Sequence, residues 1–428
     1  MNFLRKNSLI KKLVFVLAVS FLLPLFFIFV FLPVSAEETQ LREKDYFASS
    51  EIYPYLQNVS QTGITIRWKT DFSQIGKVEY GLDSSYGFVE EEKEPKKYHK
   101  IQLKNLKPDT IYHYRIKSGS IYTQDSIFRT APSSKSSFSF IVYGDTRANS
   151  SFEPFSKEYK LLVQTMLFNN PQTIIFHLGD FCYTGALDEW KSQFFYPTKD
   201  ILRTTVLYPV IGNHEYANRD IYKNYYSVFG KGAGSADFYY SFNYGNVHFI
   251  VLDTNQKYEV GSSQYNWLLN DLNSPQAVNA KWIIVLMHHP AYSSYRPSLK
   301  IQESLVPLFE KKGVDVVFQG HDHFYERHYK DGVYYIVSGG GGAPLKKQGD
   351  KTEYRQFYAR TFEYVLVNAS PKFLSLAVYD INGEVIDNLI INSKPIPFFI
   401  YFLSGLAIFS LVLIILFLAR RRKRFQKN

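Results

Sequence analysis

The sequence predicts an N-terminal all-β sandwich, then an α/β domain of packed mixed sheets flanked by helices, then a C-terminal transmembrane helix. Residues 45–131 hold short runs rich in β-branched and aromatic residues, separated by Gly, Asp, Ser and Pro, with no helical period. From residue 138, apolar runs of strand length alternate with helical stretches. Residues 396–419 carry no charge. The 428 residues are enough for two domains and a large core.

The sandwich is expected to occupy residues 37–132. Its predicted strands cover residues 64–69, 76–80, 99–103 and 110–117. Trp68 and the later run 106–114, which contains a tyrosine placed to pin a strand corner, resemble a fibronectin type III domain. This resemblance implies a fold and no activity. Residues 130–137, rich in serine, link the sandwich to the next domain.

The α/β domain is expected to occupy residues 133–392. Its predicted strands cover residues 138–143, 173–178, 206–211, 247–252, 282–287, 314–318 and 334–337. Its predicted helices cover residues 155–168, 264–272 and 301–312. Such alternation favours sheets packed together with helices on the outside.

Residues 1–36 are typical of a secretion signal. Basic residues come first, apolar residues 13–32 follow, and small residues precede a cleavage point after Ala36. The apolar run is long for a signal and contains Pro24. A cleaved signal peptide and a retained signal anchor therefore both stay open.

Residues 393–428 are predicted to hold a transmembrane helix and a basic cytoplasmic tail. The uncharged segment 396–419 is long enough to span a hydrocarbon core of about 30 Å. Arginines and lysines follow at once in residues 420–427, which places this end in the cytoplasm by the positive-inside rule. The basic N-terminus is expected on the same side. We therefore expect a cell-membrane protein whose folded part, residues 37–395, is extracytoplasmic.

The formal net charge of +10 comes from the two ends of the chain. Residues 37–395 contain 39 Lys and Arg against 39 Asp and Glu, so this part is neutral. Nucleic acid is therefore excluded as the expected partner. The single cysteine, Cys182, excludes an intrachain disulfide and is expected to be a small buried residue.

Potential metal ligands follow five of the predicted strands, where α/β folds build their sites. In chain order they are Asp145, Asp180 with Tyr183, Asn213 with His214, His288, and His321 with His323. The carboxylate, amide, imidazole and phenol groups are enough for two ions about 3.5–4 Å apart. A carboxylate combined with a phenol suits a hard trivalent ion such as Fe(III).

The motifs GD, GDxxY, GNHE, VxxH and GHxH occur in this order within residues 138–342. They resemble the motifs of the calcineurin-like metallophosphoesterases and, within these, the purple acid phosphatases. The preceding β-sandwich matches the layout of that family too. Most of the superfamily is expected to carry Asp-x-His in the first motif, but this chain has Arg147 there. Tyr183 supplies the replacement ligand, as in purple acid phosphatases.

The resemblance implies two metal ions. It assigns the first, Fe(III), to Asp145, Tyr183, His323 and a bridging Asp180. It assigns the second, which would be Zn(II), Fe(II) or Mn(II), to Asp180, Asn213, His288 and His321. Such ions polarise phosphoryl oxygens and lower the pKa of bound water from about 15.7, so that a metal-bound hydroxide attacks the phosphate ester.

His214 is the best candidate to steady the phosphate or to protonate the leaving oxygen. A structural role, with the imidazole bonded to Glu215 or another acid, stays open and is compatible with the first. His289 and Arg296 are weaker candidates for substrate binding. For both, a partner-holding or surface role is the alternative.

We therefore expect a membrane-anchored, acid phosphatase-like enzyme that hydrolyses small phosphomonoesters at a two-metal site, with Asp180 and His214 as catalytic residues. A phosphodiesterase or a nucleotide pyrophosphohydrolase on the same site is the first alternative, because two-metal sites accept several ester classes. A non-catalytic cell-surface binding protein with a structural metal site is the second. The intact ligand set and His214 argue against the second alternative.

Overall fold

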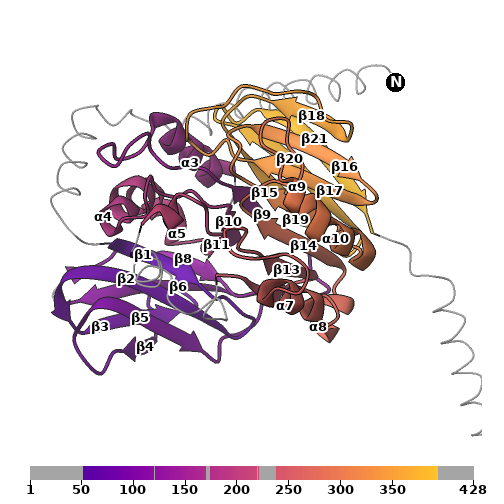
Figure 1. Ribbon diagram of the computed structural model, residues 1–428. Helices are drawn as coiled ribbons and strands as arrows, with labels where there is room; N and C mark the ends of the chain where they lie inside the picture. The colour runs from indigo at the N-terminus through magenta and orange to yellow at the C-terminus, as the bar shows by residue number, and fades with distance from the viewer. Residues whose placement is uncertain (1–51, 120, 170–173, 219, 221–237, 394–428) are drawn as a thin grey trace, which may run out of the picture. The chain divides into compact units, whose positions relative to one another are not determined.

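The computed structural model describes residues 52–393, except for residues 120, 170–173, 219 and 221–237 (Figure 1). The expected signal, residues 1–36, and the expected transmembrane segment, residues 396–419, lie outside the described residues. Within the described part of the chain, no helix is both long enough and apolar enough to cross a membrane.

The N-terminal strands form the predicted sandwich, drawn in indigo and violet in Figure 1. One sheet contains β1 (Ile52–Gln57), β2 (Gly63–Gln74) and β5 (Lys96–Lys104). The other contains β4 (Phe88–Glu91), β3 (Gly76–Gly81), β6 (Ile111–Ser118) and β7 (Ile121–Tyr122), with β8 (Ser126–Arg129) paired to β6. The Tyr112 hydroxyl accepts a 2.9 Å hydrogen bond from the backbone N–H of Lys107. This contact is the expected pin at the strand corner.

The α/β domain contributes six strands to a nine-stranded sheet. They are β9 (Phe138–Tyr143), β10 (Ile174–His177), β11 (Val206–Pro209), β19 (Glu363–Ala369), β20 (Phe373–Asp380) and β21 (Val385–Asn392). The order across the sheet is β21-β20-β19-β9-β10-β11-β1-β2-β5. Strands β9, β10 and β11 run parallel, so their carboxyl ends meet at one edge.

A second sheet has seven strands in the order β12-β13-β14-β15-β17-β16-β18. They are β12 (Tyr240–Tyr244), β13 (Val247–Val251), β14 (Trp282–Met287), β15 (Val316–Gln319), β16 (Tyr325–Lys330), β17 (Val333–Ser338) and β18 (Arg355–Ala359). Strands β13, β14, β15 and β17 are parallel. The expected α/β class with mixed sheets is confirmed.

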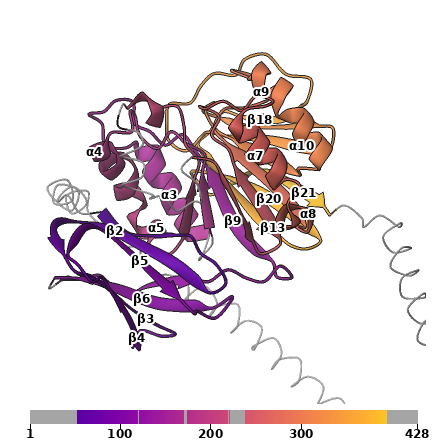
Figure 2. The same cartoon turned by 60° about the horizontal axis from the view of Figure 1, so that its bottom comes forward.

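Helices lie on both sides of this pair of sheets (Figures 1 and 2). They are α3 (Lys157–Asn169), α4 (Leu187–Glu189), the π-helix η1 (Trp190–Phe195), α5 (Tyr196–Leu202), the 3-10 helix η2 (Glu215–Ala217), α7 (Ser263–Asp271), α8 (Pro275–Val278), α9 (Leu299–Ser304) and α10 (Val306–Lys312). The helix expected at 301–312 is broken at Leu305, because Pro307 lacks the N–H that would continue it.

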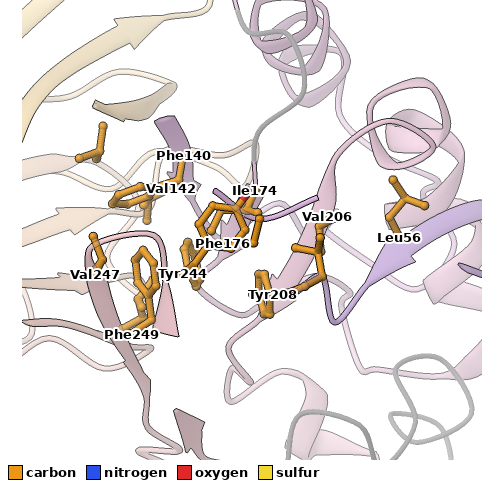
Figure 3. Close-up of a cluster of buried hydrophobic side chains, with 14 of the residues drawn as sticks. Leu56, Phe140, Val142, Ile174, Phe176, Val206, Tyr208, Tyr244, Val247 and Phe249 are labelled. Carbon is orange, nitrogen blue, oxygen red and sulfur yellow. Dashed lines mark hydrogen bonds between the residues drawn. The ribbon is translucent and has the colours of Figure 1, made fainter. Parts of the chain in front are cut away.

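The main core lies between the two sheets (Figure 3). Phe140 and Phe176, from the nine-stranded sheet, meet Phe249 from the other, with ring centroids 5.1 and 4.6 Å from it. Two outer clusters pack the helices onto the sheets. One places α3, η1 and α5 on the nine-stranded sheet, and the other places α7, α9 and α10 on the seven-stranded sheet.

The sandwich and the α/β domain share one sheet. Strand β1 pairs in parallel with β11, with Leu56 opposite Val206, and both side chains are buried (Figure 3). The sequence does not predict this pairing, which joins segments about 150 residues apart.

Candidate metal centre

The expected metal ligands lie just beyond the carboxyl ends of parallel strands in both sheets. Asp145 follows β9, Asp180 and Tyr183 follow β10, Asn213 follows β11, His288 follows β14, and His321 and His323 follow β15. Hydrogen bonds join the first two loops, since the backbone N–H groups of Asp145 and Thr146 donate to the carbonyl oxygens of Gly179 and Asp180. The edges of the two sheets therefore deliver these side chains to one place.

The first group of ligand atoms comes from Asp145, Asp180 and His323. These atoms lie within 4.8 Å of one another, and all three side chains are buried. His323 Nε2 is 3.6 Å from Asp145 Oδ1. Two carboxylates and one imidazole at this spacing are a suitable set for a hard cation.

The second group contains three imidazoles, those of His288, His289 and His321, also within 4.8 Å of one another. His288 Nε2 lies 3.0 Å from Asn213 Oδ1 and 3.2 Å from His321 Nδ1. The same nitrogen is 3.4 Å from Asp180 Oδ1. Asp180 therefore lies between the two groups, as a bridging ligand must.

Tyr183 and His214 lie beside the first group. Their ring centroids are 5.6 Å apart. His214 Nδ1 is 2.5 Å from the carbonyl oxygen of Tyr183, and its backbone N–H donates to Asp180 Oδ1 at 3.0 Å. His214 Nε2 is 3.8 Å from Asp180 Oδ2. Among the hydrogen bonds of the described residues, none joins the His214 ring to Glu215.

Three expected ligands adopt a backbone conformation that non-glycine residues rarely take. Asp145, Asp180 and His321 have φ angles of +61°, +57° and +70°. A cost of about 1–3 kcal/mol for each is typical, and such residues concentrate at functional sites. Gly212 lies close to the ligands as well, because a Cβ atom at this position would lie 2.3 Å from Asp180 Oδ1.

Glu215 holds the second and third ligand loops together, a role that its place in the sequence does not predict. Its buried carboxylate accepts hydrogen bonds from the backbone N–H groups of Gly212, Asp180, Phe181 and Cys182, at 2.8–3.3 Å. Glu215 is the last residue of the GNHE motif, and the sequence suggests it only as a partner of the His214 ring, because sequence alone does not show which loop faces it.

Gln193 has a similar role. Its Oε1 accepts from the backbone N–H of Tyr183 at 2.8 Å and from that of Ala148 at 3.3 Å, and its Nε2 donates to the carbonyl oxygens of Ser150 and Glu153. Gln193 lies on the π-helix η1, and no sequence signal distinguishes it from any other glutamine.

The pKa values of the carboxyl groups in the centre are shifted in opposite directions. Burial, with the charge of Asp180, raises the pKa of Asp145 well above its ordinary value. For Asp180, burial acts upward, but His288, His214 with its backbone N–H, and Arg147 together outweigh it and lower the pKa. Burial, with the charge of Asp180, also raises the pKa of Glu215 to about 8. Two neighbouring buried carboxylates are costly unless a cation balances them.

Burial favours the neutral form of three of the imidazoles. Burial lowers the pKa of His323 to about 3, that of His289 to about 3, and that of His321 to a still lower value. A neutral imidazole offers a free lone pair, as metal binding requires. Asp145 Oδ1 is buried and has no hydrogen-bond partner among the described residues. A cation would satisfy this oxygen, so the donor set fits the two-metal site that the sequence predicts.

His289 and Arg296 have defined partners in the structure. His289 Nδ1 lies 2.8 Å from the Thr254 hydroxyl, while its ring centroid is 4.6 Å from that of His321. Arg296 donates from Nε to Asp322 Oδ1 and from Nη2 to the carbonyl oxygen of His321, both at 3.1 Å. Arg296 therefore braces the loop of His321, with an exposed side that still faces solvent.

Family comparisons agree with this geometry. Residues 138–325 match the calcineurin-like phosphoesterase family, and residues 50–130 match the purple acid phosphatase N-terminal domain. A probable purple acid phosphatase 20 of Arabidopsis thaliana is 31% identical over 58% of this chain and 61% of its own length. A phosphoenolpyruvate phosphatase of Allium cepa is 28% identical over 58% of this chain and 54% of its own length. The chain thus spans little more than half of each relative.

The fold has solved counterparts. The purple acid phosphatase PPD1 from seeds of yellow lupin, Lupinus luteus, superposes with a TM-score of 0.70 over 80% of this chain and 74% of its own, at 23% identity. At that identity the likeness concerns the fold alone. The two family matches assign residues 138–325 to the calcineurin-like phosphoesterases and residues 50–130 to the purple acid phosphatase N-terminal domain, so the chain is a purple acid phosphatase-like metallophosphoesterase with an N-terminal fibronectin type III-like domain.

Proposed function

We propose that this protein is a two-metal phosphatase that hydrolyses phosphomonoesters outside the cytoplasm. The observation that carries the proposal is the pair of adjoining ligand groups that meet at Asp180. The name of the Allium cepa relative, a phosphoenolpyruvate phosphatase, supports a monoester as substrate. A phosphodiesterase or pyrophosphohydrolase on the same site predicts a different ester preference and is tested below.

The positions of the ligand groups support two ion sites. Asp145, Tyr183 and His323 would hold Fe(III), and Asn213, His288 and His321 would hold Zn(II), Fe(II) or Mn(II), with Asp180 serving both. When bound, such cations polarise a phosphoryl group and lower the pKa of water. A buried, preformed set of neutral imidazoles and carboxylates keeps the binding geometry fixed before substrate arrives.

The position of His214 suits proton transfer. Its Nδ1 faces the carbonyl oxygen of Tyr183, which can only accept, so Nδ1 carries the hydrogen in the neutral ring. Nε2 is then the nitrogen that gains or gives up a proton, and it lies on the side of Asp180. Burial lowers the pKa of His214, which makes its protonated form a stronger acid toward a leaving oxygen.

The metals can be identified through Tyr183. A phenolate bound to Fe(III) absorbs visible light, so the purified protein should be coloured and Tyr183→Phe should remove the band. The phenylalanine keeps the ring beside His214 and changes only the oxygen. An iron-containing, colourless wild-type protein would refute the assignment of Tyr183 to the ferric ion.

Placement at the membrane is the second part of the proposal. It rests on the signal-like residues 1–36 and the uncharged residues 396–419 with their basic flank. Intact cells treated with protease should lose the α/β domain, while a tag fused after residue 428 should stay protected. Protection of both parts would refute the orientation.

The decisive experiment combines elemental analysis of the purified full-length protein with rates on 4-nitrophenyl phosphate and bis(4-nitrophenyl) phosphate. Two metals per chain with faster hydrolysis of the monoester would support the proposal. Faster hydrolysis of the diester would favour the phosphodiesterase. Two bound metals without turnover on either ester would favour the surface binding protein.

A further inference from the structure

Arg147 occupies the position that most of the superfamily is expected to give to a metal-binding histidine. It comes two residues after Asp145, and its backbone N–H donates to the carbonyl oxygen of Asp180 at 3.0 Å. Its side chain is 13% exposed, and its Cζ lies 5.7 Å from the centroid of the Tyr183 ring. The guanidinium therefore lies at the first ligand group, on the side of Tyr183.

The hydrogen-bonding capacity of this guanidinium is largely unused. Within the described residues, its one hydrogen bond runs from Nη1 to the carbonyl oxygen of Ala148, at 3.1 Å. Nε is buried without an acceptor in that part of the chain, since Asp180 Oδ2 is 3.9 Å away. A buried charged donor without an acceptor is costly, which points to an acceptor supplied by a ligand.

The neighbouring Arg296 differs in this respect. Its Nε and Nη2 are both bonded, to Asp322 and to the loop of His321. The remaining donors of Arg296 can face solvent, because its side chain is 46% exposed, whereas Arg147 has a buried Nε without an acceptor among the described residues. It cannot act as a metal ligand itself, because a guanidinium has hydrogen-bond donors and no acceptor.

We propose that Arg147 binds non-bridging oxygens of the substrate phosphate and makes the centre select doubly charged phosphomonoesters over singly charged diesters, an inference that rests on the proposed function. A planar guanidinium matches two phosphate oxygens at once. A monoester offers three such oxygens and up to two negative charges, whereas a diester offers two oxygens and one charge. Arginine at this position would therefore favour the substrate with the greater negative charge, where histidine would bind a metal.

The test uses the full-length protein with its metals and two substitutions, Arg147→Gln and Arg147→Lys. Glutamine removes the charge at similar length, and lysine restores the charge without the planar fork. Arg129→Gln is the matched control, because Arg129 pairs with Asp109 in the sandwich, where it is 46% exposed. Three quantities are measured: metal content, the dissociation constant of inorganic phosphate by calorimetry, and the ratio of kcat/KM for mono- and bis(4-nitrophenyl) phosphate.

Arg147→Gln should weaken phosphate binding at least tenfold and lower the monoester-to-diester ratio at least tenfold, with metal content unchanged. Arg147→Lys should recover part of both losses, and Arg129→Gln should match the wild type. Unchanged phosphate affinity and ratio in Arg147→Gln would overturn the inference, as would loss of metal in that variant.

The phosphate titration also separates this inference from the proposed function. A wild-type protein that hydrolyses neither ester refutes the phosphatase. If Arg147→Gln still weakens phosphate binding in that protein, Arg147 remains a phosphate-binding residue. If the wild type is an active phosphatase and Arg147→Gln keeps its ratio and affinity, the inference alone fails.

Discussion

At the scale of single residues, side chains outside the expected ligand set hold the ligand loops in place. Glu215 is the clearest case, because its two carboxylate oxygens accept hydrogen bonds from four backbone N–H groups in two ligand loops. Those loops carry Asp180, which is expected to serve both ions, and Asn213, which is expected to serve the second. A change at Glu215 should therefore appear in metal affinity before it appears in the chemical step.

Glu215→Gln is expected to weaken metal binding about 10–100-fold. The substitution replaces one acceptor oxygen by an NH2 group, which leaves backbone N–H donors without acceptors and faces them with another donor. Competition with a chelator measures the affinity. Glu92→Gln, the same change at a buried carboxylate of the sandwich, is the control and should bind metal as the wild type does. Equal affinities for both variants would contradict the role of Glu215.

His214→Ala is expected to reduce kcat about 10²–10⁴-fold while metal content stays the same. The loss should be larger for a phenyl ester than for a nitrophenyl ester, because a good leaving group needs less help from an acid. His214→Asn tests positioning, since its amide can still donate to the Tyr183 carbonyl oxygen but cannot transfer the proton. A rate restored by asparagine would show that His214 only holds the loop.

At the scale of elements, the glycine-rich loop after β17 fixes the first ligand loop from the opposite side. The backbone N–H of Gly341 donates to the carbonyl oxygen of Gly144, and that of Ala343 donates to the carbonyl oxygen of Asp145, at 2.9 and 2.8 Å. Glu363, at the start of β19, accepts from the Ser338 hydroxyl and from the backbone N–H of Gly340. Strand β19 thus anchors a loop that carries no ligand but positions one.

Glu363 makes stability depend on pH. Burial raises its pKa from an ordinary 4.5 to about 8, so the folded state keeps a proton that the unfolded chain releases. Its contribution is complete below about pH 4.5 and is lost as the pH rises toward 8. Urea denaturation at several pH values should show this fall in the wild type and a smaller fall in Glu363→Gln. Parallel curves for the two proteins would show that Glu363 is not the titrating group.

Many of these strands can be predicted from the sequence, because buried strands are continuous apolar runs. Strands β9 and β14 are buried apolar runs. Gly-Asp follows the first and His-His follows the second, so the sequence shows where each strand ends. Strands β16 and β21 have charged or polar residues between their apolar ones and are partly exposed, so a continuous apolar run does not predict them. The expected ligands can be predicted because they follow buried strands. Partners such as Gln193 cannot be predicted, because only the folded chain brings them near.

At the scale of the whole molecule, the shared sheet couples the sandwich to the metal centre. Besides the β1–β11 pairing, the Tyr114 hydroxyl in β6 donates to the carbonyl oxygen of Arg203 at 2.7 Å, just after α5. Strand β11 then leads directly to Asn213. A domain joined only by a linker could unfold independently, whereas strands that share one sheet are expected to unfold cooperatively.

Leu56→Ala tests this coupling, because Leu56 is fully buried in β1 opposite Val206. A destabilisation of about 2–5 kcal/mol is expected from the lost methyl groups and the cavity. Hydrogen exchange followed by mass spectrometry should show β2 and β10 losing protection together, by the same free energy. Val89→Ala, in the exposed strand β4, is the control and should change little. If Leu56→Ala weakened β2 while β10 kept its protection, the sandwich would be an independent domain, and the metal centre would owe its stability to the α/β layers alone.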